Sequence, residues 1–484
     1  MNPDTQLAPR TTTRWPLTGR SPAPAPAPGG AWPVRLPARV RSLDAGRMAA
    51  VRDSWRALWS SRLFVWAVGV GTIAAFGFGP QRKAFDPPGL TSGFGWLGDA
   101  LAAPAARWDS AWYLEIARYG YRPDLGAASA ARDAYYPLYP LALRAVAWLG
   151  APAVLAGVLV SIGAFALALY GIHRLTTLEL RGGARRALAE DRVADAARLA
   201  VLVVAFAPMA FFFSAVYSES LYMALSVGVF WSARHGRWAR VGVLGALATA
   251  THNTGMVLLA PALLIYLYGP REDRPAERGS AGSGERRLRA RLRPRYRLRR
   301  DALWLGVMPL GVVLFAAYLG LAGGSPLGSF HAEGAWSRHL TTPFAGLWEA
   351  LRAAFDGARQ LLSLQDHHAY FAAAQGSPLV NAEHNVLMLV ILALAVPAIV
   401  GVLRRLPLAY GVYVIAALAL PLSDPVRSEP LQSLPRFMVV LFPLGIWLGA
   451  WLAERPRAQR PVLVGSGLLM ALFLAQFATW HWVA

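Results

Sequence analysis

Long runs of apolar residues, separated by short basic segments, alternate along the chain from about residue 60 onward. A helix that crosses a bilayer needs about 20 consecutive apolar residues. Arginine and lysine collect on the cytoplasmic side of membrane helices, so the basic segments give the direction of each pass. Counting on this basis predicts about eleven passes. Their ranges are 63–79, 152–171, 199–216, 221–233, 241–252, 254–268, 302–322, 386–403, 407–422, 437–453 and 461–480.

This pattern predicts an all-α, polytopic integral protein of a cell membrane, with a cytoplasmic N-terminus and an extracytoplasmic C-terminus. Residues 1–60 contain the sequence SPAPAPAPGG and scattered arginines without a sustained apolar period. Such a composition is typical of disordered chain, and we expect a basic cytoplasmic arm here. Residues 61–482 are then expected to form one transmembrane domain.

Three long segments connect the predicted passes. Residues 81–151 are expected to form the first extracytoplasmic loop, with helices at the membrane interface, and residues 323–384 a second, large extracytoplasmic loop. Residues 269–301 form an arginine-rich cytoplasmic loop, for which contact with anionic lipids is favoured over nucleic-acid recognition. The four passes between residues 199 and 268 are shorter than roughly 20 residues, which indicates helices that end beside a cavity within the membrane.

Composition and charge exclude several classes of protein. With 55% hydrophobic and 15% charged residues the chain is too apolar for an ordinary soluble domain, and its net charge of +21 lies largely in the arm and the connections. Because there is no cysteine, disulfides, thiolate metal sites and cysteine nucleophiles are excluded. We find no GxxxxGK(S/T) nucleotide fingerprint, and we expect no cofactor.

The first candidate for chemistry is the segment Arg107-Trp108-Asp109. The residues after it have helical spacing, with an apolar aromatic face suited to the membrane interface and Gly120 as a stop. Asp109 would lie at the start of that helix, either as a helix cap or as a functional carboxylate. In the first case Arg107 would only extend its charge to the interface.

Two further segments allow a structural and a functional interpretation. Glu219 falls at the tip of a short helix pair, where it is either part of a solvated turn or helix cap, or a functional carboxylate that holds an acceptor sugar or orients Arg436. The stretch 135–140 cannot be a plain helix, because Pro137 and Pro140 remove backbone donors. Its tyrosines could stack on sugar or belong to an aromatic belt.

Histidines in the large loop raise the question of a metal site. Asp366-His367-His368 lies in the same loop as three further histidines, but adjacent histidines are not the usual i, i+4 ligand pair. We therefore predict no metal, and a loop that shapes access for the acceptor.

Five motifs in order resemble the PIG-V-like mannosyltransferases, over roughly residues 60–480. One departure is His252, which stands where the TR(S/N)TG motif of that family has arginine, and another is the enlarged arginine-rich loop. The motifs are the Arg107-Trp108-Asp109 helix ending Tyr119-Gly120-Tyr121, then Tyr135 to Pro140, Tyr217-Ser218-Glu219-Ser220-Leu221, the run from Arg234 to Arg237 with Ala248 to Gly255, and Leu434-Pro435-Arg436-Phe437.

The resemblance implies a GT-C glycosyltransferase with an acidic catalytic residue in its first outer loop and a polyprenyl-phosphate sugar as donor. An acceptor hydroxyl must lose a proton as it attacks the anomeric carbon, and Asp109 is the candidate base of an inverting transfer, with Glu219 as a second catalytic candidate. Cations would stabilise the departing phosphate. The candidates are Arg107, His252 and Arg436 for the phosphate, and Trp108, Trp112, Tyr113, Tyr136, Tyr139, Tyr217, Ser218 and Asn253 for the substrate cavity.

The expected activity is transfer of mannose from a polyprenyl-phosphate donor to a lipid or glycan acceptor of the cell envelope, by a monomer in contact with membrane lipids. The competing class is a transporter or flippase of a prenyl-linked sugar, which would also have many passes and discontinuous helices. A third class is a non-catalytic scaffold that binds prenyl lipids. An enzyme would depend on Asp109, whereas a scaffold would tolerate its loss.

Overall fold

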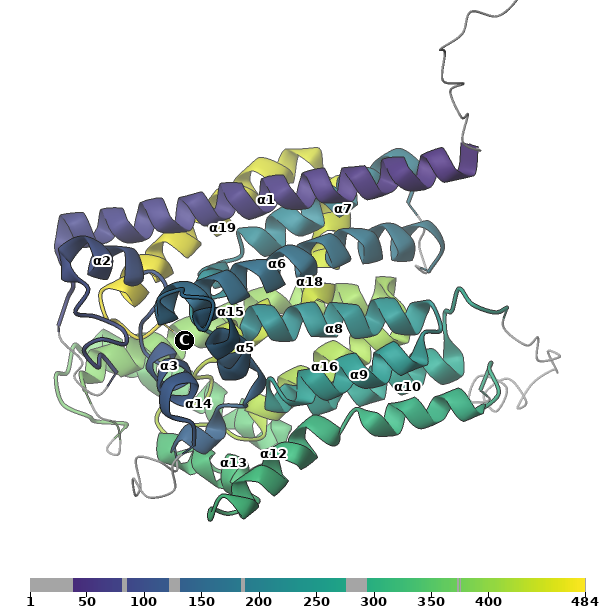
Figure 1. The fold of residues 1–484 in the computed structure, drawn as a ribbon. Coiled ribbons are helices and arrows are strands. Elements are labelled where there is room, and N and C mark those ends of the chain that lie inside the picture. The colour runs from purple at the N-terminus through teal and green to yellow at the C-terminus, as the bar shows by residue number, and fades with distance from the viewer. Residues whose placement is uncertain are drawn as a thin grey trace, which may run out of the picture. The chain divides into compact units, whose positions relative to one another are not determined.

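The computed structural model describes residues 38–80, 85–121, 131–183, 188–275, 294–371, 374 and 376–483. It divides into two units, Met1–Gly46 and Arg47–Ala484, and the second carries all the features discussed below. The described part of this unit is helical and contains no β-strand, only two isolated bridges (Figure 1). The prediction of an all-α chain is confirmed for these residues.

Most residues of the apolar runs predicted as membrane passes lie in helices, but the runs 199–216, 302–322 and 437–453 are each interrupted between two helices. In the labels, η marks 3-10 helices except for η3, which is a π-helix. In chain order the elements are α1 (Ala38–Phe76), α2 (Gly95–Ala102), α3 (Ser110–Tyr119), η2 (Ala131–Ala134), α5 (Leu138–Ala147), α6 (Ala153–Leu178), η3 (Glu179–Gly183), α7 (Glu190–Ala205), η4 (Ala210–Ser214), α8 (Glu219–Arg234), α9 (Trp238–Thr249), η5 (Asn253–Leu258), α10 (Leu259–Tyr268), η6 (Arg300–Val307), α12 (Leu310–Leu321), α13 (Gly328–His331), η7 (Ala332–Trp336), α14 (Pro343–Ser363), α15 (Pro378–Arg405), α16 (Leu408–Leu422), α17 (Leu434–Val439), α18 (Phe442–Ala453) and α19 (Pro456–Ala478).

Several of these helices are suited to a membrane. Four of them are long and apolar enough to cross a bilayer, and a fifth is counted if η6 and α12, which meet at a bend of 41°, form one broken span. The protein is therefore a membrane protein. The count of eleven passes and the sidedness of the loops stay predictions. The four spans are Ala45–Phe76, Ala153–Arg181, Pro378–Arg405 and Pro456–Ala478.

The first helix begins earlier than the apolar run alone indicates. Residues 38–60, which we assigned to a disordered arm, are helical and continue directly into the apolar part of α1. No proline follows Pro37 until Pro80, and alanine and arginine are frequent in this stretch and favour a helix. Residues 1–37 of the predicted arm lie outside the described residues.

Small residues allow the central helices to approach closely. A Cβ atom added to Gly449 on α18 would lie 2.6 Å from the carbonyl oxygen of Ala196 on α7, and one added to Gly445 would meet Val204 at 2.4 Å. Close backbone approach through glycine and alanine is a usual way to pack helices in a membrane. Helices α6, α7, α8 and α18 thereby form the core beside which the site lies (Figure 1).

A buried ionic network fixes the far end of α8. Arg234, the last residue of α8, pairs with Glu179, and the hydroxyl of Tyr410 on α16 donates to the same carboxylate at 2.9 Å. Glu179 and Arg234 are almost fully buried, so losing either partner would leave an uncompensated charge. This network anchors the helix whose first residue is Glu219.

Helix α3 begins after Asp109 and ends at Gly120, as the sequence predicts. Protein covers most of its aromatic face: Tyr113 and Ile116 are buried in the protein core, Trp112 packs against that core, and Tyr119 is exposed. The periodicity correctly indicated an apolar face but could not identify the partner that covers it. In this case the partner is protein.

Helix α5 begins inside the proline-containing stretch 135–140. Pro137 occupies the cap position and Pro140 lies in the first turn of Leu138–Ala147. The prediction that no plain helix runs through these residues holds up to Pro137 and is wrong for the last three. The first turn of a helix tolerates proline because its backbone N–H groups lack intrahelical partners in any case.

Gly120→Ala is expected to destabilise the protein by about 1 kcal/mol, because Gly120 adopts a φ of 72° that L side chains rarely take. No atom lies within 4 Å of the added methyl group, so backbone strain alone would account for the loss. Thermal unfolding in detergent measures it. Gly163→Ala is the matched control, since Gly163 lies within α6 with equal space around it. A loss as large in the control would contradict the assignment of strain to Gly120.

Candidate active site

Arg436 joins the two carboxylates that the sequence singled out. Its Nη1 atom lies 2.6 Å from Oδ2 of Asp109, and its Nε atom lies 3.4 Å from Oε1 of Glu219. The three side chains are only 5–11% exposed. They come from three separate elements: Asp109 directly precedes α3, Glu219 begins α8, and Arg436 lies on α17. A buried guanidinium that holds two carboxylates gives a rigid, charged centre.

Two strained backbone positions lie next to this centre. Trp108 has a φ of 55° and Ser433 a φ of 66°, and both are in the left-handed region that residues other than glycine rarely occupy. Trp108 directly precedes Asp109, and Ser433 lies one helical turn before Arg436, whose Nη2 atom donates to the Ser433 hydroxyl at 3.4 Å. Strain of this kind costs about 1–3 kcal/mol and clusters at functional sites.

Asp109 does not act as a side-chain cap for α3. It occupies the cap position, but its carboxylate makes no capping hydrogen bond and is directed to Arg436 instead. The structure therefore does not support the capping interpretation of Asp109. The contact with Arg436 uses Oδ2, so Oδ1 is not needed for it.

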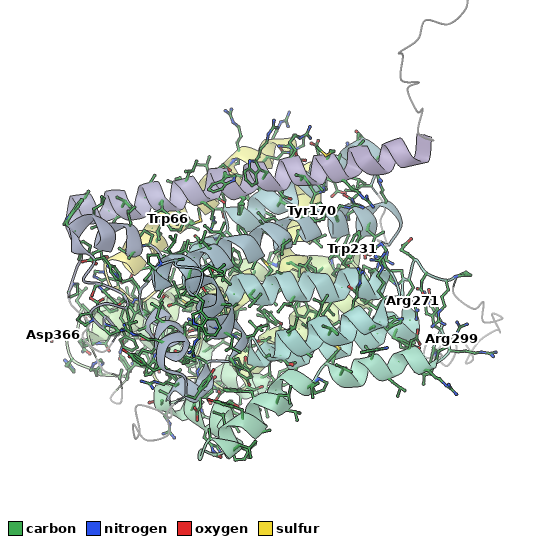
Figure 2. The ribbon with its side chains drawn as sticks, viewed as in Figure 1. Trp66, Tyr170, Trp231, Arg271, Arg299 and Asp366 are labelled. Atoms are coloured by element: carbon green, nitrogen blue, oxygen red, sulfur yellow. The ribbon has the colours of Figure 1, made fainter. Side chains whose placement is uncertain are left out.

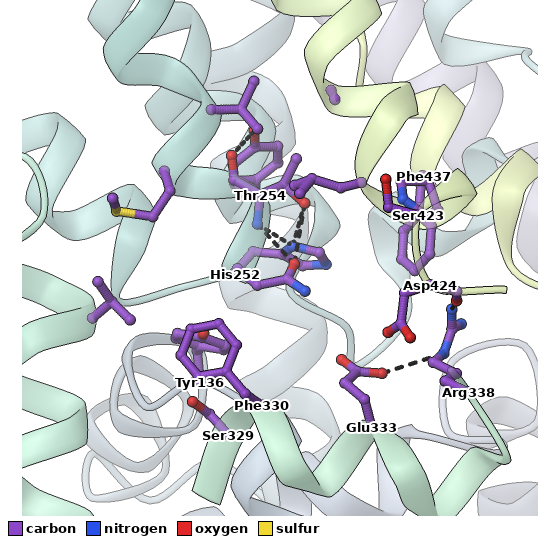
Figure 3. A pocket seen from close by; sticks show the side chains of 18 of the residues that line it. Tyr136, His252, Thr254, Ser329, Phe330, Glu333, Arg338, Ser423, Asp424 and Phe437 are labelled. Carbon is purple, nitrogen blue, oxygen red and sulfur yellow. Dashed lines mark hydrogen bonds and ion pairs between the residues drawn. The ribbon is translucent and has the colours of Figure 1, made fainter. Parts of the chain in front are cut away.

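Two neighbouring cavities meet at this centre. The larger has a volume of about 520 Å³ and is shown in Figure 3, and the smaller has a volume of about 90 Å³. Asp109 and Arg436 line the smaller cavity, whereas Glu219 lines both. Oε2 of Glu219 is buried without a hydrogen-bond partner among the described residues. The residues common to both cavities are Tyr136, Glu219, His252, Asn253, Glu333, Arg338 and Phe437.

His252 lies in the break between α9 and η5 and lines both cavities. The backbone N–H of Thr254 donates to its Nδ1 atom at 3.2 Å. A nitrogen that accepts a hydrogen bond carries no proton, so the neutral ring holds its proton on Nε2. His252 therefore has a donor for an anionic group, as the arginine of the resembled motif would.

Other predicted cavity residues form a buried layer behind Asp109. The Tyr113 and Ser218 hydroxyls lie 2.9 Å apart, and the Tyr217 hydroxyl donates to the carbonyl of Arg107 at 3.1 Å. Tyr139 donates to the carbonyl of Gly157 at 3.0 Å. Of these residues only Tyr113 lines a cavity, the smaller one, so the others support the site without facing it.

The structure does not bring Arg107 to the cavities. Its Nε atom donates to the carbonyl of Ala478 at 3.2 Å, and its guanidinium lies 4.6 Å from the ring centroid of Trp480. Burial lowers the pKa of Arg107 to about 10, while Asp86 and Asp99 oppose this shift. Arg107 therefore stays charged at neutral pH and joins the segment before α3 to the end of α19.

Trp108 and Trp112 also lie outside both cavities. The Trp108 ring packs edge-on against Trp480 and Trp482, and the Trp112 ring stacks on Tyr135 with 5.9 Å between centroids. These aromatic contacts hold the backbone on either side of Asp109, and their partners could not be predicted from the sequence.

Arg107→Gln is expected to lower stability by roughly 2 kcal/mol, because it removes a charged hydrogen bond and a cation–π contact. For the sugar donor that the resemblance implies, the Michaelis constant should change by less than about twofold, because Arg107 lines neither cavity. Thermal unfolding and donor titration measure the two quantities. If the Michaelis constant for the sugar donor rose tenfold while the stability stayed unchanged, Arg107 would again be a candidate for binding the donor phosphate.

Sequence reasoning missed three charged residues of the cavity walls. Glu333 and Arg338 belong to the large segment between α12 and α15, and Asp424 follows α16. Nε of Arg338 lies 3.3 Å from Oε2 of Glu333, and its Nη1 donates to the Asp424 carbonyl at 2.8 Å. Burial raises the pKa of Glu333 above its ordinary value. The sequence shows that these three residues are charged, but no hydrophobic periodicity around them predicts that they lie at a cavity.

The histidines of the large segment do not gather into a metal site. Asp366 and His367 are exposed, His339 pairs with Glu349, and His384 lies 3.7 Å from Glu429. Asp366 lies at the end of the molecule away from Arg271 and Arg299 (Figure 2). Within the described ranges no group of three or more possible ligands is arranged to hold a metal ion.

Comparison with known proteins agrees with the motifs. Residues 84–266 match the family model described as Mannosyltransferase (PIG-V), a range that includes Asp109, Glu219 and His252. No curated protein and no solved structure matches the chain. Arg436 lies outside the matched range, but the structure places it on the two carboxylates within that range. The match of this segment supports a PIG-V-like mannosyltransferase, and hence a glycosyltransferase.

Proposed function

We propose that this membrane mannosyltransferase transfers mannose from a polyprenyl-phosphate donor to a lipid or glycan acceptor of the cell envelope, on the extracytoplasmic side and with inversion. The observation that carries the proposal is the buried contact of Arg436 with both Asp109 and Glu219 on the wall of two joined cavities.

In the proposed reaction Asp109 acts as general base. Its carboxylate takes the proton of an acceptor hydroxyl as the hydroxyl oxygen bonds to the anomeric carbon. The bond from that carbon to the phosphate oxygen breaks at the same time, and its electron pair leaves with the lipid phosphate. Arg436 holds the carboxylate in place through Oδ2 and leaves Oδ1 for the acceptor. Attack from the side opposite the leaving group inverts the anomeric centre.

The larger cavity supports a lipid-linked donor. Four apolar side chains that line it are also 40–89% exposed and form an apolar rim, through which a prenyl chain could reach the bilayer. Nε2–H of His252 is the proposed donor to the leaving phosphate, in place of the arginine of the family motif. The rim residues are Met256, Phe330, Leu340 and Leu420.

The mannosyltransferase match supports an enzyme over the transporter or flippase and over the scaffold. A flippase needs no base beside its lipid site, whereas here Asp109 lines the smaller cavity and Glu219 lines both cavities. The larger cavity, of about 520 Å³, has the size of a ligand site. A GT-C architecture, expected from the resemblance, remains part of the proposal.

The test compares donors in washed membranes that contain the protein. We expect mannose transfer from polyprenyl-phosphate-mannose and none from GDP-mannose when synthesis of the lipid donor is blocked. Membranes that lack the protein are the control. Transfer from GDP-mannose under the block, with none from the lipid donor, would contradict the proposal.

A further inference from the structure

The residues shared by the two cavities have a composition suited to a sugar ring. Tyr136 and Phe437 are aromatic, and rings of this kind offer an apolar face to the C–H groups of a sugar. Asn253, Glu219 and Glu333 supply planar acceptors for hydroxyl groups. The junction of the cavities therefore combines a stacking surface with several hydrogen-bond acceptors.

Glu333 is delivered to this junction by a segment fixed to the rest of the protein. The backbone N–H of His339 donates to the Pro425 carbonyl at 3.2 Å, and that of Thr341 donates to the Ser423 carbonyl at 2.8 Å. Arg338 adds its bridge between Glu333 and Asp424. Figure 3 shows Glu333, Arg338 and Asp424 together on one side of the cavity, with His252 and Tyr136 beyond them.

Acidic side chains outnumber basic ones on the walls of the two cavities. The acidic residues are Asp109, Glu219, Glu333 and Asp424, and the basic ones are Arg338 and Arg436. Carboxylates in such surroundings are suited to accept hydrogen bonds from neutral hydroxyls. Oε2 of Glu219, buried and without a partner in the described part of the chain, is one acceptor left for that purpose.

We propose that Glu333 is a sugar-recognition residue whose carboxylate, held by Arg338, accepts hydrogen bonds from hydroxyls of a hexose at the junction, where Glu219 lines the same two cavities. This inference rests on the proposed function, and it names the group that the site selects. The hexose belongs either to the donor or to the acceptor. The experiment separates these two sources by their Michaelis constants.

The first measurement is steady-state transfer by Glu333→Ala and Glu333→Gln. Glu333→Ala is expected to raise the Michaelis constant for one substrate about tenfold or more, and Glu333→Gln roughly threefold, because the amide keeps one acceptor. The turnover number should change less than about threefold. A raised constant for the donor alone places the donor hexose at Glu333, and a raised constant for the acceptor alone places the acceptor hexose there.

Glu349→Ala is the matched control. Glu349 lies on α14 in the same segment, pairs with His339 and lines neither cavity, so both constants should keep their wild-type values. Equal behaviour of the Glu333 and Glu349 variants would overturn the inference, as would a loss in turnover number alone. If Glu333→Ala fails to fold, Glu333→Gln, which keeps the side-chain volume, carries the comparison.

A binding measurement separates the inference from the proposed function. Methyl mannoside is added to the purified protein, and binding is followed by the fluorescence change of the tryptophans, since Trp336 lines the smaller cavity. Weaker binding by Glu333→Ala, in a protein whose wild type transfers no mannose from the lipid donor, would refute the proposed function and support the inference. Unchanged binding and unchanged Michaelis constants in an active enzyme would refute the inference alone.

Discussion

Asp109→Asn is expected to lower the turnover number for mannose transfer by roughly 100- to 10,000-fold, the range that a positioned general base contributes. Asparagine keeps the shape of the side chain and a carbonyl oxygen for Arg436, but it cannot take a proton. The fold should therefore persist, and donor binding should change little. Turnover at saturating donor, measured at equal protein level, gives the effect.

Asp99→Asn is the matched control for this variant. Asp99 lies on α2, accepts a hydrogen bond from the Phe94 backbone at 2.9 Å and lines neither cavity. Its change removes the same charge from the same part of the chain, so transfer should keep its wild-type rate. If both variants lose activity equally, the loss comes from the removal of a negative charge in this region, and Asp109 is not shown to be the base.

Arg436→Met is expected to abolish measurable transfer and to destabilise the protein by about 3–5 kcal/mol. Removal of one partner from a buried ionic group leaves the other charges uncompensated, and here two carboxylates lose their cation. Arg436→Lys should restore only part of the stability, because an ammonium group lacks the planar fork that reaches both carboxylates.

The triple variant Asp109→Asn, Glu219→Gln, Arg436→Met separates stability from catalysis. Removal of all three charges should recover most of the lost thermal stability, since no buried charge remains unpaired, but it should not recover transfer. Thermal unfolding and the transfer assay are compared for the single and triple variants. A triple variant as unstable as Arg436→Met would show that the ionic contact is not the cause of the loss.

The sequence predicts the helices well because each is a local pattern. The apolar runs, Gly120 as the end of α3 and Asp109 at its start follow from residues a few positions apart. What covers a helix face is not local, so the sequence predicts a membrane interface for the aromatic face of α3, whereas protein buries Tyr113 and Ile116 on it. Pro140 was misplaced for a related reason, because proline breaks a helix or begins one according to its position.

The candidate site also contains some residues that could be predicted from the sequence and others that only the fold brings together. Asp109 and Arg436 are 327 residues apart, and only the resemblance put both among the candidates before the structure placed them 2.6 Å from each other. From its charge, Arg107 was as good a candidate for phosphate binding as Arg436, but the sequence does not show that its partners lie at the end of α19. Glu333 lies in a segment without a hydrophobic period, so only the fold of that segment brings it to the cavities.

Asp109 as general base is tested most directly by single-turnover transfer from labelled polyprenyl-phosphate-mannose by purified protein in liposomes, for wild type and Asp109→Asn, with donor affinity measured in parallel. We expect a mannosylated acceptor of inverted anomeric configuration from the wild type, and nearly none from the variant at equal donor affinity. Transfer by the variant at the wild-type rate would show that Asp109 is not the base.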